Sequence, residues 1–209
     1  MDAGAADRKA YVALPVPEKQ FPGIMGLLNS WPDSGRVLAE LAEVLLRQPH
    51  SLARGERELI AAYVSGLNSC GYCCSSHSAF AAAQLNGGMS LVEQVHADPH
   101  TAPISAKLRS LLRLAAAVRE SGRSVTQEII TAARAQGATD SEIQHTVLIA
   151  AAFCMFNRYV DGLNAWTPED PDTFVGMASQ IVDHGYRDVL ENQSAQRESV
   201  RSEDAVRKP

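Results

Sequence analysis

Apolar side chains recur every three to four residues along most of the chain, which is the spacing of a helix with one buried face. The stretch from Ser105 to Glu120 is the clearest example. Its inward positions are Leu108, Leu111, Leu112, Ala115 and Val118. Similar stretches cover residues 35–49, 51–68, 70–88, 90–95, 124–137, 139–162 and 174–189. No useful alternation of apolar and polar residues indicates a strand, so the pattern predicts an all-α fold.

Several residues are typical of helix ends. Ser51 is a good N-cap residue for the helix that ends near residue 68. The segments 124–127 and 139–142 both have the spacing of a capping box, Ser or Thr followed three residues later by Gln or Glu. They predict two helices, the first ending at Gly137 and the second at about Gly162.

Composition divides the chain into a body with two flanking segments. Residues 1–35 are rich in Pro and Gly, so we expect an extended arm that cannot sustain a helix and that lies on the body or on a neighbouring subunit. Phe21, Ile24 and Met25 are its candidate anchors. Residues 36–190 form one all-α domain, and the polar residues 191–209 are expected to be a disordered tail.

Charge and hydropathy exclude several classes of partner. The chain has 209 residues, 45% of them apolar, which is enough for a sizeable core. Its net charge of -5 argues against nucleic acid as the main partner. The start of the chain has no apolar signal region, and the longest apolar run, residues 147–156, is half the length of a membrane span. We therefore expect a soluble, cytoplasmic protein without a membrane partner.

The candidate chemistry lies between Glu58 and His77. Cys70 and Cys73 form a Cys-x-x-Cys pair, and His77 follows four residues after the second cysteine. A helix starting near Cys70 puts both thiols in its first turn, where free N–H groups and the helix dipole favour a thiolate. The same helix puts His77 beside Cys73, where a neutral imidazole can accept the thiol proton. A carboxylate such as Glu58 could then orient His77.

One contact does not follow from helix geometry. A plain helical hairpin about residue 70 sets His77 opposite Tyr63, so contact with Glu58 needs a skewed crossing or an intervening water. Two alternatives also stay open for these residues. The cysteines and His77 can be core residues, since free cysteine is often buried. The two cysteines, His77 and Glu58 can also be ligands of a zinc ion, although structural zinc usually takes its ligand pairs from separate segments.

The spacing of the four residues resembles a known family. Glu58, Cys70, Cys73 and His77 carry the signature of the alkyl hydroperoxidase D group within the carboxymuconolactone decarboxylase-like superfamily. The segments ALPVPE, GERELIAAYVS, CGYCCSSHSAF and FNRYVDGL are similar to its peroxidase-related branch. The resemblance covers roughly residues 13 to 190.

The resemblance implies a compact all-α fold that assembles into trimers or hexamers. It implies that Cys73 attacks a hydroperoxide and becomes a sulfenic acid, which Cys70 resolves as a disulfide. Glu58 and His77 would relay protons. An external thiol, in relatives a dihydrolipoamide-bearing protein, would reduce the disulfide. The resemblance implies no metal, flavin or haem.

The chain departs from the pattern beside the second cysteine. Some relatives carry a relay histidine there, whereas this chain has Tyr72. Cys74 is an additional thiol that could compete as the resolving partner. Two other functions therefore stay open, a redox-sensing or interaction protein that uses the same disulfide and a decarboxylase-type lyase. The intact cysteine pair counts against the lyase, because that branch does not depend on it.

Overall fold

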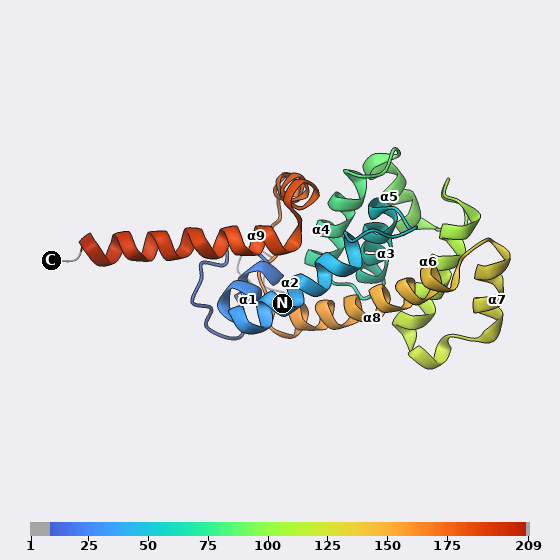
Figure 1. The fold of residues 1–209 in the computed structure, drawn as a ribbon, viewed down its shortest axis with the longest axis horizontal. Coiled ribbons are helices and arrows are strands. Elements are labelled where there is room, and N and C mark those ends of the chain that lie inside the picture. The colour runs from blue at the N-terminus through green and yellow to red at the C-terminus, as the bar shows by residue number, and fades with distance from the viewer. Residues whose placement is uncertain (1–8, 208–209) are drawn as a thin grey trace, which may run out of the picture.

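The structure, a computed structural model, describes residues 9–207, and beyond residue 195 it describes the backbone alone. This part of the chain contains no strand, so the prediction of an all-α fold is confirmed for it. Figure 1 shows how the helices are arranged. They are α1 (Ile24–Ser30), α2 (Pro32–Leu46), α3 (Arg54–Leu67), α4 (Gly71–Ala82), α5 (Gly88–Ala97), α6 (Ala106–Glu120), the 3₁₀ helix η2 (Gly122–Ser124), α7 (Gln127–Ala135), α8 (Asp140–Gly162) and α9 (Pro171–Arg207).

Capping residues fix the starts of two long helices. The Ser105 hydroxyl caps α6 by accepting the N–H of Leu108 at 3.1 Å. At the start of α8, Thr139 accepts the N–H of Glu142 at 3.2 Å, and the Glu142 carboxylate accepts the N–H of Thr139 at 2.9 Å. The capping box predicted there is confirmed, because two otherwise unpaired N–H groups are satisfied reciprocally.

Two other predicted helix starts are wrong. Helix α3 begins at Arg54, where the N–H of Ala53 donates to the Glu56 carboxylate at 2.9 Å, and Ser51 lies outside it. Helix α7 begins after Thr126, whose hydroxyl accepts the N–H of Ile129. Ser124 belongs instead to η2. At α7 both Ser124 and Thr126 suit an N-cap, so the sequence pattern alone chose the wrong one. At α3 the N-cap residue is Ala53, which no side-chain preference for capping could indicate.

The N-terminal segment is less extended than expected. The statement that residues 1–35 cannot sustain a helix is wrong, because α1 and the first turn of α2 lie within them. Pro32 occupies the first position of α2, where its missing N–H costs nothing. Phe21 and Met25 are buried and Ile24 lines a cavity, so the predicted anchors do contact the body.

The C-terminal segment also differs from expectation. We expected residues 191–209 to be disordered, whereas the backbone of α9 stays helical to Arg207 and projects beyond the body in Figure 1. Residues 208 and 209 lie outside the described part. The segment is rich in Glu, Gln, Ala and Arg, which have high helix propensity without tertiary contacts. The division of the chain into arm, domain and tail stays a prediction.

Two apolar clusters meet where the candidate site lies. One is centred on α3, α6 and α8 and includes Leu59, Leu111 and Phe153. The other joins the N-terminal segment to α4 and α9 and includes both Cys70 and Cys73. Helix α3 packs along α4, and α4 in turn packs against α9. The cysteine pair is therefore held between the two clusters.

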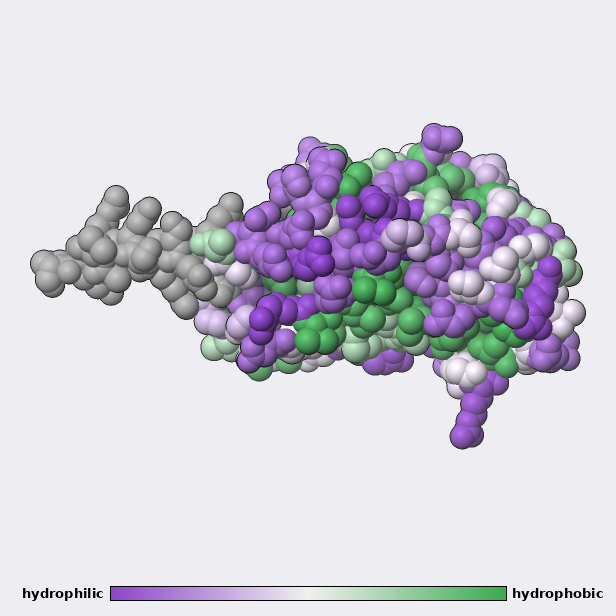
Figure 2. All heavy atoms as spheres, in the orientation of Figure 1, coloured by the Kyte–Doolittle hydropathy of each residue, from purple (hydrophilic) through white to green (hydrophobic). Residues whose placement is uncertain are grey.

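The surface carries few large apolar side chains. Figure 2 shows a mostly polar face with apolar residues gathered over α2 and α8, where Val37, Val44, Leu148 and Met155 are exposed. Among the described residues, no helix is both long and apolar enough to cross a membrane.

The capping box of α8 gives a test of the fold. We expect Thr139→Ala to lower the free energy of unfolding by about 1 kcal/mol, because the N–H of Glu142 loses its acceptor. For a chain of this length that corresponds to a fall of about 2–4 °C in the melting temperature. The matched control is Thr131→Ala on the exposed face of α7, which should leave the temperature nearly unchanged. Equal effects of the two substitutions in thermal unfolding would contradict the capping role.

Candidate functional site

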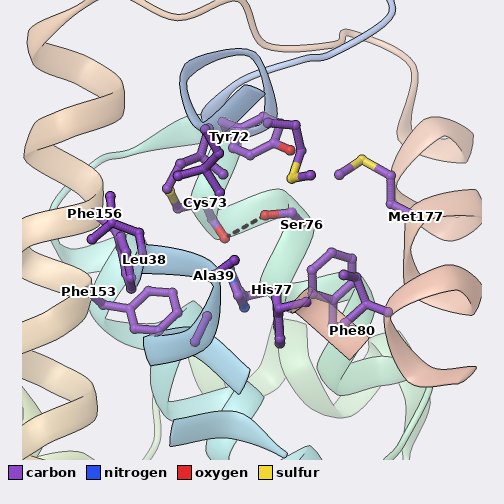
Figure 3. Close-up of a pocket in the computed structure, with 16 residues that line it drawn as sticks. Leu38, Ala39, Tyr72, Cys73, Ser76, His77, Phe80, Phe153, Phe156 and Met177 are labelled. Atoms are coloured by element: carbon purple, nitrogen blue, oxygen red, sulfur yellow. Dashed lines mark hydrogen bonds between the residues drawn. The ribbon is translucent and has the colours of Figure 1, made fainter. Parts of the chain in front are cut away.

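A small apolar cavity opens where α1, α2, α4, α8 and α9 meet. Its volume is about 60 Å³. Figure 3 shows Cys73 and His77 among its lining side chains, with the rings of Phe153 and Phe156 on α8 and the Met177 side chain on α9. Cys70 is not part of the lining. One thiol of the pair therefore faces the cavity, and the other lies behind it.

The start of α4 positions both cysteines. Cys70 is the N-cap residue and Cys73 is the third residue of the helix. Ser69, with φ +59°, turns the chain between α3 and α4. Both thiols are buried, Cys70 with 0% and Cys73 with 2% of its surface exposed, and both are free. The free N–H groups of a helix start stabilise a negative charge, so this end of α4 suits a thiolate.

The surroundings of Cys70 hold its proton in place. The pKa of Cys70 is raised far above its ordinary value, first because its thiol hydrogen-bonds Cys73 and second because it is buried. Electrostatic interaction with Cys73 and Asp161 contributes further. Cys70 therefore keeps its proton behind Cys73, the thiol of the pair that faces the cavity.

Glu58 and His77 are in direct contact. The Nδ1 atom of His77 lies 2.7 Å from Oε2 of Glu58, and the Glu58 side chain is only 1% exposed. Measured from the ends of α3 and α4 that face each other, the two residues differ in height by about 4–5 Å, one helical turn. The reach of the two side chains spans that offset, so the contact expected to need a skewed crossing or a water is made directly, without an intervening water.

A third side chain completes this contact. The Tyr186 hydroxyl on α9 donates to Oε1 of Glu58 at 2.6 Å. Burial, followed by the charge of Glu58 and this hydrogen bond, raises the pKa of Tyr186 well above its ordinary value, so the hydroxyl stays protonated and donates. Both carboxyl oxygens of Glu58 therefore have a hydrogen-bond partner. When the carboxylate accepts the N–H at Nδ1 of His77, Nε2 of the imidazole is left free to accept a proton.

Aromatic rings fix the orientation of His77. The ring of Phe153 meets the imidazole edge to face at a centroid distance of 4.6 Å, and Phe80 does so at 5.1 Å. Tyr186 stacks on it at 6.1 Å. Rings in these positions leave the imidazole little freedom to rotate, so its second nitrogen is held in one direction.

Helix α9 reaches the site through a break at Gly185. This residue has φ +90° and ψ 173°, a conformation open essentially to glycine. A Cβ atom there would lie 2.5 Å from Oε2 of Glu43. Glu43 also accepts the N–H of Tyr186 at 2.9 Å, and Arg47 donates to the carbonyl oxygens of Ile181 at 2.6 Å and Val182 at 3.0 Å. The end of α2 therefore holds both sides of the break.

The remaining candidates lie away from the cavity or serve packing. Tyr72 lines the cavity, is 2% exposed and packs edge to face on Phe174, and burial raises its pKa. Cys74 points to the far side of α4, where its sulfur lies 3.9 Å from Nε2 of His96. Burial raises the pKa of Cys74 as well. Cys154 is partly buried and accepts a long hydrogen bond from Asn68 at 3.6 Å.

The site residues are not arranged as a set of metal ligands. Among the described residues, no three side chains of His, Cys, Asp or Glu are placed to hold a metal ion together. The four residues considered for zinc divide instead into a Glu58–His77 pair and a Cys70–Cys73 pair.

The structure thus brings together Glu58, Cys70, Cys73 and His77, and their catalytic roles stay predictions. Sequence reasoning missed Tyr186, which is 128 residues from Glu58 along the chain. No spacing signal links residues so far apart. The only local hint is the glycine before it, which interrupts an otherwise helical pattern.

Fold and site together define a helical protein with a buried cysteine pair beside a carboxylate–imidazole pair. The model of the carboxymuconolactone decarboxylase family matches residues 32–97 and 89–168. The chain belongs to the carboxymuconolactone decarboxylase family. A comparison with curated proteins found no match.

Two solved structures have a similar fold. One is the alkylhydroperoxidase AhpD core of an uncharacterized peroxidase-related protein from Ralstonia eutropha JMP134, with 24% identity and a TM-score of 0.70 over 81% of this chain and 96% of that one. The other is an uncharacterized peroxidase-related protein from Silicibacter sp. TM1040, with 23% identity and a TM-score of 0.70 over 81% of this chain and 97% of that one. The fold is therefore of the alkyl hydroperoxidase D type.

The break in α9 gives a prediction with a built-in control. We expect Gly185→Ala to destabilise the protein by at least about 1–3 kcal/mol, because the conformation is strained for alanine and its Cβ meets Glu43. Gly176→Ala in the same helix meets no atom within 4 Å and should stabilise by up to about 1 kcal/mol. Denaturant unfolding of both variants measures the difference. Equal effects would show that the break at Gly185 is not required.

Proposed function

We propose that this protein is a thiol-dependent hydroperoxide reductase. The proposal rests above all on the way Cys73 and His77 line one apolar cavity while a buried Glu58 holds Nδ1 of His77. This arrangement presents a thiol and a proton acceptor to the same bound molecule. Family membership and the similar fold support the same class of chemistry.

The first half of the reaction oxidises Cys73. His77 accepts the Cys73 proton on Nε2, and the imidazolium and the start of α4 stabilise the thiolate. The thiolate sulfur attacks the terminal oxygen of R–O–O–H, and the O–O bond breaks. The leaving alkoxide takes the proton back from His77 and departs as an alcohol, or as water when the substrate is hydrogen peroxide. Cys73 is left as a sulfenic acid.

The second half forms and then removes a disulfide. The Cys70 sulfur attacks the Cys73 sulfur, and the S–O bond breaks. The departing hydroxide takes the proton that Cys70 has kept until then, and leaves as water. An external dithiol then supplies two electrons and two protons by thiol–disulfide exchange, which restores both thiols and oxidises the dithiol.

Cavity size and polarity limit the substrate. A cavity of 150 Å³ holds benzene, whereas this one has about 60 Å³. Hydrogen peroxide and short-chain alkyl hydroperoxides fit that volume. The lining is apolar apart from a few groups near the sulfur, so an alkyl chain is accommodated without unpaired polar atoms.

The direct test follows peroxide and thiols in the same sample. The reduced protein is mixed with one equivalent of hydrogen peroxide or ethyl hydroperoxide, and peroxide loss and disulfide position are measured together by assay and peptide mass spectrometry. The proposal expects one peroxide consumed per cysteine pair and a Cys70–Cys73 disulfide. Peroxide that persists with the pair still reduced would overturn it.

Single cysteine variants separate the two roles. Cys73→Ser should lose peroxide reduction entirely, whereas Cys70→Ser should consume one equivalent and stop at a sulfenic acid on Cys73 that a dimedone probe traps. Cys154→Ser is the matched control and should behave like the wild type, because Cys154 lies outside the cavity. Full peroxide turnover in Cys73→Ser would contradict the assignment of Cys73 as the thiol that attacks the peroxide.

A further inference from the structure

Tyr186 contacts the carboxylate–imidazole pair but is not part of the family signature. It lies in α9, beyond residues 32–168 that match the family model. Its hydroxyl is the second hydrogen-bond donor to Glu58, at 2.6 Å, and its ring stacks on His77. It therefore contacts both members of the carboxylate–imidazole pair from outside the helices that carry them.

The break in α9 places complementary charges at two helix ends. The first half of α9 ends before Gly185, and the Arg47 guanidinium binds its last carbonyl oxygens at Ile181 and Val182. The second half begins at Tyr186, whose N–H donates to the Glu43 carboxylate. A cation at a helix C-terminus and an anion at an N-terminus are both favoured by the helix dipole.

Glu43 of α2 and Arg47, the residue directly after α2, also form an ion pair with each other. Nε of Arg47 lies 3.3 Å from Oε1 of Glu43, and their side chains are only 10% and 12% exposed. Ion pairs sheltered from water are less screened than surface pairs, so the attraction between these two side chains is strong enough to hold them in one arrangement. The absence of a side chain at Gly185 lets the pair approach the backbone.

We propose that Tyr186 is a positioning residue for the thiol chemistry, which it serves by orienting the Glu58 carboxylate toward His77. The Glu43–Arg47 pair sets its position through the break at Gly185. The inference rests on the proposed function for its purpose, but its geometry and its test do not depend on a peroxide.

The hydroxyl controls which nitrogen of His77 is free. With the hydroxyl present, Glu58 stays a carboxylate, Nδ1 donates to it, and Nε2 can accept the Cys73 proton. Without the hydroxyl, one oxygen of a carboxylate that is 1% exposed loses its donor, which favours the protonated acid. A protonated Glu58 donates to Nδ1, so the proton of His77 moves to Nε2 and the imidazole no longer acts as the base.

Few other charged groups lie near Glu58 and His77. The cavity walls from α1 and α8 contribute only apolar side chains, Ile24, Met25, Leu28, Phe153 and Phe156. The titratable or charged groups on the remaining elements are Arg57 beside Glu58 on α3, Cys73 on α4, Glu43 on α2 with Arg47 directly after it, and Tyr186 itself. Tyr72 on α4 also lines the cavity, and its raised pKa keeps it neutral.

The test measures how alkylation of Cys73 depends on pH. Reduced wild type and Tyr186→Phe are treated with iodoacetamide across a pH series, and modification of Cys73 is quantified by peptide mass spectrometry. We expect the acid limb of the profile to move by about one to two pH units to higher pH in the variant, with a 10- to 100-fold slower reaction at neutral pH. The rates should converge at high pH, where hydroxide from the solvent takes the thiol proton and no internal base is needed.

Two further variants make the result specific. Tyr159→Phe removes the hydroxyl of a partly buried tyrosine on α8 outside the cavity and should leave the profile unchanged. Glu43→Gln should give a smaller shift in the same direction as Tyr186→Phe, because it loosens the hold on Tyr186 without removing its hydroxyl. Thermal unfolding of each variant checks that the fold is retained.

The outcomes separate this inference from the proposed function. Superimposable profiles for Tyr186→Phe and wild type would overturn the positioning role, and so would a reaction slowed equally at every pH, which indicates a general structural effect. If the profile shifts but neither protein consumes peroxide, the positioning role stands and the peroxidase fails. A shift in Tyr186→Phe with none in Glu43→Gln would overturn the part assigned to the Glu43–Arg47 pair.

Discussion

A buried carboxylate organises this structure. Glu58 has almost no contact with water, and burying a charge is costly unless hydrogen-bond donors compensate for the lost hydration. The donors come from two other helices, His77 of α4 and Tyr186 of α9, so the same requirement ties α3, α4 and α9 together. In the proposed reaction the same carboxylate holds Nδ1 of His77 and leaves Nε2 for a proton from Cys73. The constraint that stabilises the site is therefore also the one on which the proposed chemistry depends.

The two thiols of the cysteine pair occupy different surroundings. Cys73 faces the cavity from the first turn of α4, whereas Cys70 lies behind it and keeps its proton. The order of the proposed reaction follows from this difference. Residues outside the signature complete the enclosure, since Phe153 on α8 and Met177 on α9 also line the cavity.

Features that depend on neighbours along the chain could be predicted from the sequence. The all-α class, the course of α6 and α8 and the Thr139 cap follow from local spacing, and the resemblance supplied the four residues of the signature. The direct contact of Glu58 with His77 could not be derived, because it depends on the offset between α3 and α4. The role of Tyr186 could not be predicted, because its position depends on the break at Gly185. That break is held by Glu43 and Arg47, which are distant in the sequence. The prediction that residues 1–35 form no helix was wrong for a local reason, because Pro32 suits the first position of a helix as well as an extended arm.

The measurement that tests the account most directly is the single-turnover rate of peroxide loss in Glu58→Gln, compared with wild type by rapid mixing. Glutamine keeps the size of the side chain but removes the charge that holds the Nδ1 proton of His77. The account predicts a rate at least about 100-fold lower at neutral pH, the usual contribution of a positioned acid–base group, with the fold retained and the Cys70–Cys73 disulfide still formed by a small-molecule oxidant. A rate equal to that of wild type would mean that the buried carboxylate stabilises the fold alone, and the central claim would be wrong.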